Sequence, residues 1–179
     1  MEIEEKIVKK ETLFKGNIFD VRCDTVILPN GRKATRDNLE HCGSCAVFAV
    51  TNDNKLVLVK QYRSAIFDVT TELPAGKLDK GNEGRMEAAV RELEEETGYK
   101  AGKMVHYFDM LSAVGYCDEV ISVYLATNLK RTKQNLDDDE FLNVVEIDIK
   151  EFKESVLKGE IRDAKTVAGV MRYCLENNI

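Results

Sequence analysis

The chain of 179 residues lacks several features that define common protein classes. No stretch approaches the ~20 consecutive apolar residues that a membrane-spanning helix requires, and Met1–Glu5 lacks the apolar core of a signal peptide. Basic residues are outnumbered, with 26 Lys and Arg against 32 Asp and Glu and a net charge of −6. Because nucleic-acid-binding proteins need a basic surface, we expect neither a membrane nor a nucleic acid as partner.

A disulfide framework is also missing, since the chain has five cysteines, an odd number, without regular spacing. This pattern favours a reducing, cytoplasmic location. Cys42 and Cys45 form a lone C-x-x-C, but no second pair of Cys or His residues follows at zinc-ligand spacing. We therefore expect these two cysteines to be packing residues at the entrance of the strand-like segment Ala46–Val50.

The length and the ordinary hydrophobic and charged fractions are typical of a globular protein with a sizeable core. Strand-like segments are expected at Glu11–Phe14, Asp20–Leu28, Ala34–Asn38, Ser44–Thr51, Lys55–Tyr62, Thr70–Leu73, Lys103–Leu111, Val120–Asn128 and Phe141–Ile147. Helices are expected at Gly84–Thr97, Ile149–Lys158 and Asp163–Glu176. Pro29-Asn30-Gly31 indicates a tight hairpin turn. This order indicates an α/β fold.

The most informative segment reads GKLDKGNEGRMEAAVRELEEETGY, from Gly76 to Tyr99. Its carboxylates Glu92, Glu95 and Glu96 have the i, i+3, i+4 spacing that places them on one helix face. Like charges at this density repel one another, and oxygen ligands suit Mg²⁺ or Mn²⁺. In isolation such a run would be read as a solvated acidic face.

The neighbouring residues favour the metal-binding interpretation. Gly98 stands where a helix C-cap belongs. An apolar side of the helix is expected to consist of Ala89, Leu93 and Thr97, with Met86 and Val90 close by. Arg91 can pair with a carboxylate and hold its rotamer.

This segment resembles the motif of the Nudix hydrolases, Gly-x5-Glu-x7-Arg-Glu-U-x-Glu-Glu-x-Gly-U, in which U is a bulky apolar residue. The matches in register are Glu83, Arg91, Glu92, Leu93, Glu95, Glu96 and Gly98. There are two departures: six residues instead of five separate Gly76 from Glu83, and Tyr99 fills the last apolar position. The extra residue falls in the loop, where Gly81, Asn82 and Gly84 can absorb it.

Further segments resemble the ADP-ribose pyrophosphatase branch of that family, namely Gln61-Tyr62-Arg63, Glu72-Leu73-Pro74-Ala75-Gly76 and Asp163-Ala164-Lys165-Thr166. The resemblance implies an α/β/α sandwich with a mixed sheet over residues 41–179, preceded by a strand segment over residues 1–40. It also implies that this thin first segment packs across a two-fold homodimer. The implied activity is Mg²⁺-dependent cleavage of a nucleotide-sugar diphosphate, with Mn²⁺ as a substitute and ADP-ribose, giving AMP and ribose 5-phosphate, as the leading substrate.

The resemblance also implies roles for individual residues. Glu92, Glu95, Glu96 and the backbone carbonyl of Ala75 would hold the metal, Arg91 would orient the carboxylates, and Glu83 would contribute through a water. A catalytic base comes from a late loop in this branch, which makes Glu140 the first candidate, Asp138 the second and Glu119 a further one.

Substrate contacts are implied for Arg36, Arg63 and Glu72, with Arg36 completing the site of the dimer partner. Taken alone, either arginine would be read as a surface or salt-bridge residue. Tyr62 and Phe67 are candidates both for stacking on adenine and for the core.

One departure concerns specificity. Val114 stands where the branch typically carries a proline, which would fix the backbone near the substrate. Tyr116 lies about where dinucleoside-polyphosphate hydrolases often carry a tyrosine. The alternatives are therefore dinucleoside polyphosphates or GDP-mannose as substrate, or a nucleotide sensor without activity. Sensors of that kind tend to lose motif carboxylates, and this chain retains them, which favours an enzyme.

Overall fold

The computed structural model describes residues 2–78, 81 and 83–179. Asn82, which was expected to help absorb the extra loop residue, lies outside the described residues. The chain divides into two compact units, and the first comprises residues 1–43 and 111–120. The second comprises residues 44–110 and 121–179. No helix in the described ranges is long and apolar enough to cross a membrane.

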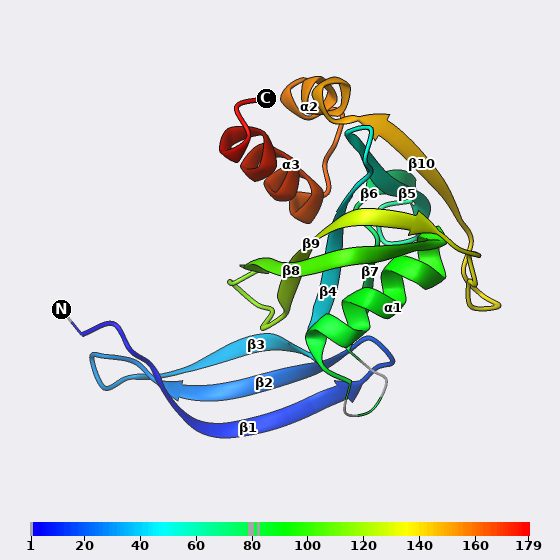
Figure 1. The fold of residues 1–179 in the computed structure, drawn as a ribbon. Helices are drawn as coiled ribbons and strands as arrows, with labels where there is room; N and C mark the ends of the chain where they lie inside the picture. Colours follow the sequence, from blue (N-terminus) through cyan, green and yellow to red (C-terminus); the bar gives the residue numbers. More distant parts are fainter. Residues whose placement is uncertain (1, 79–80, 82) are drawn as a thin grey trace. The chain divides into compact units, whose positions relative to one another are not determined.

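The first unit is built on an antiparallel sheet with the order β1-β2-β3 (Figure 1), whose strands are β1 (Lys6–Lys15), β2 (Phe19–Ile27) and β3 (Lys33–His41). The expected hairpin turn connects β2 and β3, with Gly31 at a φ of 81°. There the Leu28 N–H donates to the Arg32 carbonyl at 2.8 Å. Every residue of β1 is exposed, including the apolar Leu13 and Phe14.

The second unit contains a mixed sheet with the order β10-β5-β4-β9-β8, with β6 paired to β5 and β7 paired to β4. Its strands are β4 (Ser44–Val50), β5 (Lys55–Arg63), β6 (Asp68–Glu72), β7 (Ala75–Lys77), β8 (Tyr99–Leu111), β9 (Val120–Arg131) and β10 (Leu142–Asp148). Strand β4 runs parallel to β9 and antiparallel to β5 and β7. The expected α/β class with a mixed sheet is confirmed.

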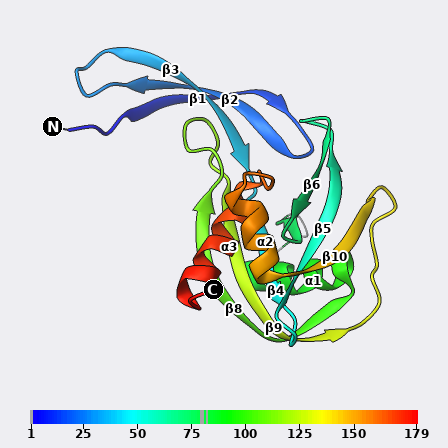
Figure 2. The ribbon, with the colours of Figure 1, turned by 90° about the horizontal axis from the view of Figure 1, so that it is seen from above.

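Helices cover both faces of this sheet, α1 (Arg85–Thr97) on one and α2 (Ile149–Leu157) with α3 (Ala164–Glu176) on the other (Figures 1 and 2). Strand β4 shows why, because its side chains alternate between two cores. Phe48 packs in the cluster that holds Phe152 of α2 and Val170 of α3. Val47 packs in the cluster that holds Leu93 of α1.

Helix α1 follows the expected boundaries to within one residue. Gly84 is its N-cap, and its N–H donates to the Glu87 carboxylate at 2.9 Å. Gly98 ends the helix in the left-handed region, with φ of 67°, and its N–H donates to the Glu94 carbonyl at 2.8 Å. A Cβ at Gly98 would lie 2.9 Å from the Gln134 backbone nitrogen, so the position also requires glycine for space.

Several expectations were wrong in detail. Ala88 shares the buried side of α1 with Ala89, Leu93 and Thr97, whereas Met86 and Val90 are exposed. Cys45 is buried, but Cys42 is exposed and therefore is not a packing residue.

The strands also differ from the sequence-based boundaries, most of all β1, β7 and β8. Strand β1 is longer than predicted, and β8 begins directly after Gly98. The short strand β7 was not predicted at all. Its residues are extended because they pair with β4, with Lys77 opposite Ser44.

Candidate active site

The three motif carboxylates lie on α1, as the spacing predicted, and Arg91 pairs with two of them. Its Nη1 lies 2.6 Å from Glu92 Oε1 and 2.8 Å from Glu95 Oε2. The other side of the guanidinium faces Glu83, with Nη2 3.0 Å from Oε2. Hydrogen bonds from Arg91 to Glu83, Glu95 and Glu92 raise the pKa of the arginine, so it stays cationic. Arg91 therefore contacts three carboxylates of the motif at once.

Glu96 faces a different partner. It is buried, and its Oε2 accepts a hydrogen bond from the Ala75 N–H at 2.9 Å. Burial raises the pKa of Glu96 to about 8, and the charges of Glu92 and Glu140 add to the effect. Burial likewise raises the pKa of Glu92, with Glu95 and Glu140 contributing. Glu92 is thus compensated by Arg91, whereas Glu96 accepts its hydrogen bond from a neutral backbone amide.

Gly76 makes room for Glu92. A Cβ at position 76 would lie 2.1 Å from the Glu92 carboxyl carbon and 2.1 Å from its Oε1. Only glycine therefore lets the carboxylate rest directly against the backbone of β7. This close approach links the glycine that opens the motif to the first carboxylate of its helical half.

The loop that carries Glu140 is anchored to the end of α1. The Gln134 side-chain amide donates to the Glu96 carbonyl at 2.6 Å, and the Asn135 N–H donates to the Glu95 carbonyl at 2.9 Å. Glu140 is half-buried, whereas Asp138 is exposed. Because the charge of Glu140 acts on both Glu92 and Glu96, the structure brings the first candidate base close to the motif carboxylates.

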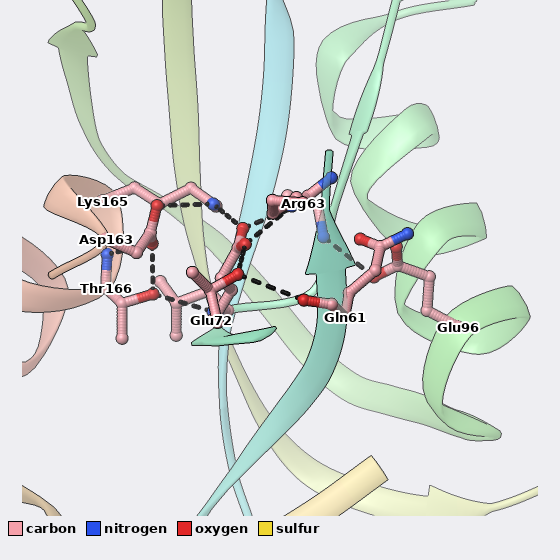
Figure 3. Close-up of polar contacts among 10 residues, drawn as sticks. Gln61, Arg63, Glu72, Glu96, Asp163, Lys165 and Thr166 are labelled. Carbon is pink, nitrogen blue, oxygen red and sulfur yellow. Dashed lines mark hydrogen bonds and ion pairs between the residues drawn. The ribbon is translucent and has the colours of Figure 1, made fainter. Parts of the chain in front are cut away.

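Arg63 and the buried Glu72 form an ion pair beside this group. Arg63 Nε donates to Glu72 Oε1 at 2.7 Å and Nη2 donates to Oε2 at 2.8 Å. Lys165 approaches the same carboxylate from the opposite side, with Nζ 2.5 Å from Oε2 (Figure 3). Burial alone would raise the pKa of Glu72, but Arg63 and Lys165 outweigh it and lower the pKa to about 2. Glu72 is therefore ionised throughout the physiological range.

Two other candidates belong to the first unit. Arg36 lies on β3 and pairs with Glu5, with Nε 3.0 Å from Oε2. Glu119 lies 3.7 Å from His41 Nδ1. Val114 is exposed in the same loop, in which the Cys117 N–H donates to the Ala113 carbonyl at 2.9 Å. That turn forms without the proline typical of the branch.

The two aromatic candidates for adenine stacking are on the surface. Tyr62 is 56% exposed and Phe67 is 83% exposed. The alternative core role is wrong for both rings.

The donor set fits a small divalent cation. Carboxylate oxygens and a backbone carbonyl are the ligands that Mg²⁺ prefers, and a cation would relieve the unfavourable burial of Glu96 and Glu92. In the side-chain positions of residues 2–78, 81 and 83–179, no three Asp, Glu, His or Cys residues lie together so that they could hold a metal ion, so Glu92, Glu95 and Glu96 would have to move closer to share one. Arg91 forms ion pairs with Glu92 and Glu95.

Sequence reasoning gave no individual role to three residues of this region. Gln134 caps the carboxyl end of α1, Lys165 binds Glu72, and Thr166 Oγ1 accepts from the Leu73 N–H at 2.8 Å. Lys165 and Thr166 belong to a segment that resembled the branch, which was a signal of importance but not of contact. Gln134 carried no signal in the sequence.

Comparison with known proteins agrees with this geometry. The model of the Nudix domain matches residues 41–170, and the model of the nucleoside diphosphate sugar hydrolase N-terminal domain matches residues 5–37. A crystal structure titled as an ADP compounds hydrolase superposes with a TM-score of 0.83 at 22% identity, covering 99% of this chain and 98% of that one. This last likeness concerns the fold alone.

Two curated relatives span nearly the whole chain. The methanol dehydrogenase activator of Bacillus methanolicus is 41% identical over 175 residues, which is 97% of this chain and 94% of the relative. The ADP-ribose pyrophosphatase of Bacillus subtilis is 40% identical over 170 residues, which is 94% and 91% of the two chains. With the motif carboxylates, the sheet and the domain match in agreement, the chain belongs to the Nudix hydrolase family.

Proposed function

We propose that this protein is a Mg²⁺-dependent pyrophosphohydrolase that cleaves a nucleotide-sugar diphosphate, with ADP-ribose, giving AMP and ribose 5-phosphate, as its best or near-best substrate. The observation that carries the proposal is that Glu92, Glu95 and Glu96 lie on α1 beside the backbone of Ala75 and Gly76, with Glu140 close enough for its charge to act on Glu92 and Glu96. The relative named ADP-ribose pyrophosphatase supports the choice of substrate.

In the proposed reaction, water attacks one phosphorus of the diphosphate and the other phosphate leaves with the bridging oxygen. Glu92, Glu95, Glu96 and the Ala75 carbonyl would hold Mg²⁺, which neutralises charge on the phosphoryl oxygens and lowers the pKa of bound water. Glu140 accepts the proton of the attacking water.

The other residues prepare this group for the reaction. Arg91 keeps Glu92 and Glu95 in their rotamers through hydrogen bonds of 2.6 and 2.8 Å. Glu83, on the far side of Arg91, contributes through a water. Arg63 provides the positive charge that binds the substrate diphosphate, since Glu72 leaves part of its guanidinium available. Its side chain is 42% exposed, so an anion has access to it.

Substrate choice tests the proposal directly. The kcat/KM values for ADP-ribose, ADP-glucose, GDP-mannose and diadenosine polyphosphates should place ADP-ribose first or close to first, with broad tolerance because Val114 replaces proline. A diadenosine polyphosphate that wins by more than ~10-fold, about 1.4 kcal/mol of transition-state preference, contradicts the branch assignment. Binding of ADP-ribose without turnover of any compound would instead indicate a sensor.

Metal dependence provides a second prediction. Activity should vanish with a chelator and return with Mg²⁺ or Mn²⁺, and Glu96→Gln should lower kcat by at least ~100-fold, the scale for losing a major electrostatic group. Glu94→Gln is the matched control, because Glu94 lies on the same helix but pairs with Lys100 at 3.0 Å. Near wild-type turnover of folded Glu96→Gln would refute its role.

Gly76→Ala should lower kcat by roughly 10- to 100-fold with little loss of stability, because a misplacement of about 1 Å in a reacting group can cost that much. The added Cβ would push the Glu92 carboxylate away. Because this carboxylate is the far end of a flexible side chain, it can move without unfolding the protein. Gly84→Ala is the control, since its Cβ would meet only Glu87, at 3.4 Å. Thermal melting and kcat are measured on both variants, and unchanged kcat in Gly76→Ala would contradict the prediction.

We also propose that the protein is a homodimer formed through its first unit, with Arg36 completing the partner's site. Support comes from β1, where Leu13 is 61% exposed and Phe14 is 59% exposed on a strand without buried residues. Light scattering at micromolar concentration should give twice the 20.3 kDa of the chain, and Leu13→Ser with Phe14→Ser should shift the mass toward one chain. A monomeric wild-type protein would refute the dimer.

A further inference from the structure

The Glu72 carboxylate has no acceptor site left for a substrate. Oε1 accepts from Arg63 Nε at 2.7 Å and from the Thr70 hydroxyl, while Oε2 accepts from Arg63 Nη2 at 2.8 Å and from Lys165 Nζ at 2.5 Å. A carboxylate offers about four lone-pair sites, and these four donors fill them. Glu72 therefore acts on the substrate through another residue.

We infer that Lys165 is a positioning residue that acts through Glu72 on Arg63, and so sets the affinity of the site for the substrate diphosphate. The inference rests on the proposed function, because it takes Arg63 as the substrate cation. Figure 3 shows Lys165 and Arg63 on opposite sides of the Glu72 carboxylate. Lys165 and Glu72 are 93 positions apart in the chain, so the fold alone brings them together.

The net charge of the cluster around Glu72 explains why Lys165 is needed in addition to Arg63. Arg63 and Glu72 are joined by two hydrogen bonds, so on their own they would neutralise each other and leave no net positive charge for an anion. Lys165 shares that carboxylate, and its one other acidic partner among the described residues is Asp163, whose Oδ1 lies 3.0 Å from Nζ. Asp163 in turn caps α3, accepting from the Thr166 N–H at 3.0 Å. The four charged side chains together are neutral, whereas the same cluster without Lys165 carries a net charge of −1 and repels an anionic substrate.

The same helix turn also supports the segment that leads to the metal site. The Leu73 N–H donates to Thr166 Oγ1 at 2.8 Å, and the Ala75 N–H, two residues further on, donates to Glu96. The first turn of α3 thus holds Glu72 through Lys165 and the adjoining backbone through Thr166. The same contacts would be present if Lys165 only stabilised the fold. The test therefore measures KM, which a loss of stability alone would not change in the folded protein.

The experiment measures kcat, KM and melting temperature with ADP-ribose and Mg²⁺ for wild type, Lys165→Met and Lys165→Arg. We expect Lys165→Met to raise KM by about 10-fold with kcat changed by less than about 3-fold, as for loss of uniform substrate binding. Lys165→Arg, which retains the charge, should recover most of the affinity. Lys153→Met is the matched control, because Lys153 donates to the Ile179 carbonyl at 3.0 Å and not to Glu72.

A double-mutant cycle shows whether Lys165 acts through Glu72. In a Glu72→Gln background, Lys165→Met should change KM by less than about 2-fold, because the acceptor of its charge is gone. A full 10-fold effect in that background would overturn the inference. If Lys165→Met does not fold, Lys165→Gln, which retains a hydrogen-bond donor, takes its place in both comparisons.

The outcomes separate the two proposals. If wild type hydrolyses ADP-ribose and Lys165→Met lowers only the melting temperature, the inference is overturned and the proposed function stands. If wild type binds ADP-ribose without cleaving it, the hydrolase proposal fails, and the dissociation constants of the same variants test Lys165 by the same criteria. If wild type neither binds nor cleaves ADP-ribose, both are overturned.

Discussion

Repulsion among carboxylates is the constraint on which this site depends. Glu92 and Glu96 lie one helical turn apart on α1, partly or fully buried, and Glu140 adds a further charge nearby. Such a group is stable only where cations, hydrogen-bond donors or a bound metal compensate it. Arg91 and the Ala75 amide provide this compensation around α1, and Gly76 provides the space that the Glu92 carboxylate needs.

The compensation is divided among different parts of the second unit. Arg91 pairs with Glu92 and Glu95 from the same helix. Glu96 accepts a hydrogen bond from the Ala75 amide, but its burial raises its pKa all the same. Gly76 allows Glu92 to reach the backbone, and Gly98 lets the chain turn so that the 132–135 segment docks on the end of α1. As a result, Glu96 is the carboxylate that the proposed metal would stabilise most.

The sequence predicted the local part of this arrangement well and the long-range part poorly. The boundaries of α1 were predictable because periodic apolar residues and a C-terminal glycine act within one segment. Strand β7 was not predictable, since three residues become a strand only by pairing with β4. Met86 and Val90 misled for a related reason: they are apolar residues on a face that the sheet does not cover. Similarly, one sequence cannot show that Lys165 reaches Glu72 or that Gln134 reaches Glu96.

These long-range contacts also bear on how a negatively charged protein could bind a negatively charged substrate. A protein of net charge −6, with an acidic helix at its candidate active site, should repel a diphosphate through simple electrostatics. Long-range repulsion is screened over about 10 Å at ordinary ionic strength, so the charges next to the substrate decide. In the proposed site Arg63 and Lys165 would be such charges, and both are held on the Glu72 carboxylate. Their positions explain how an acidic protein can present a local cation to an anionic ligand while the carboxylates of α1 remain available for a metal.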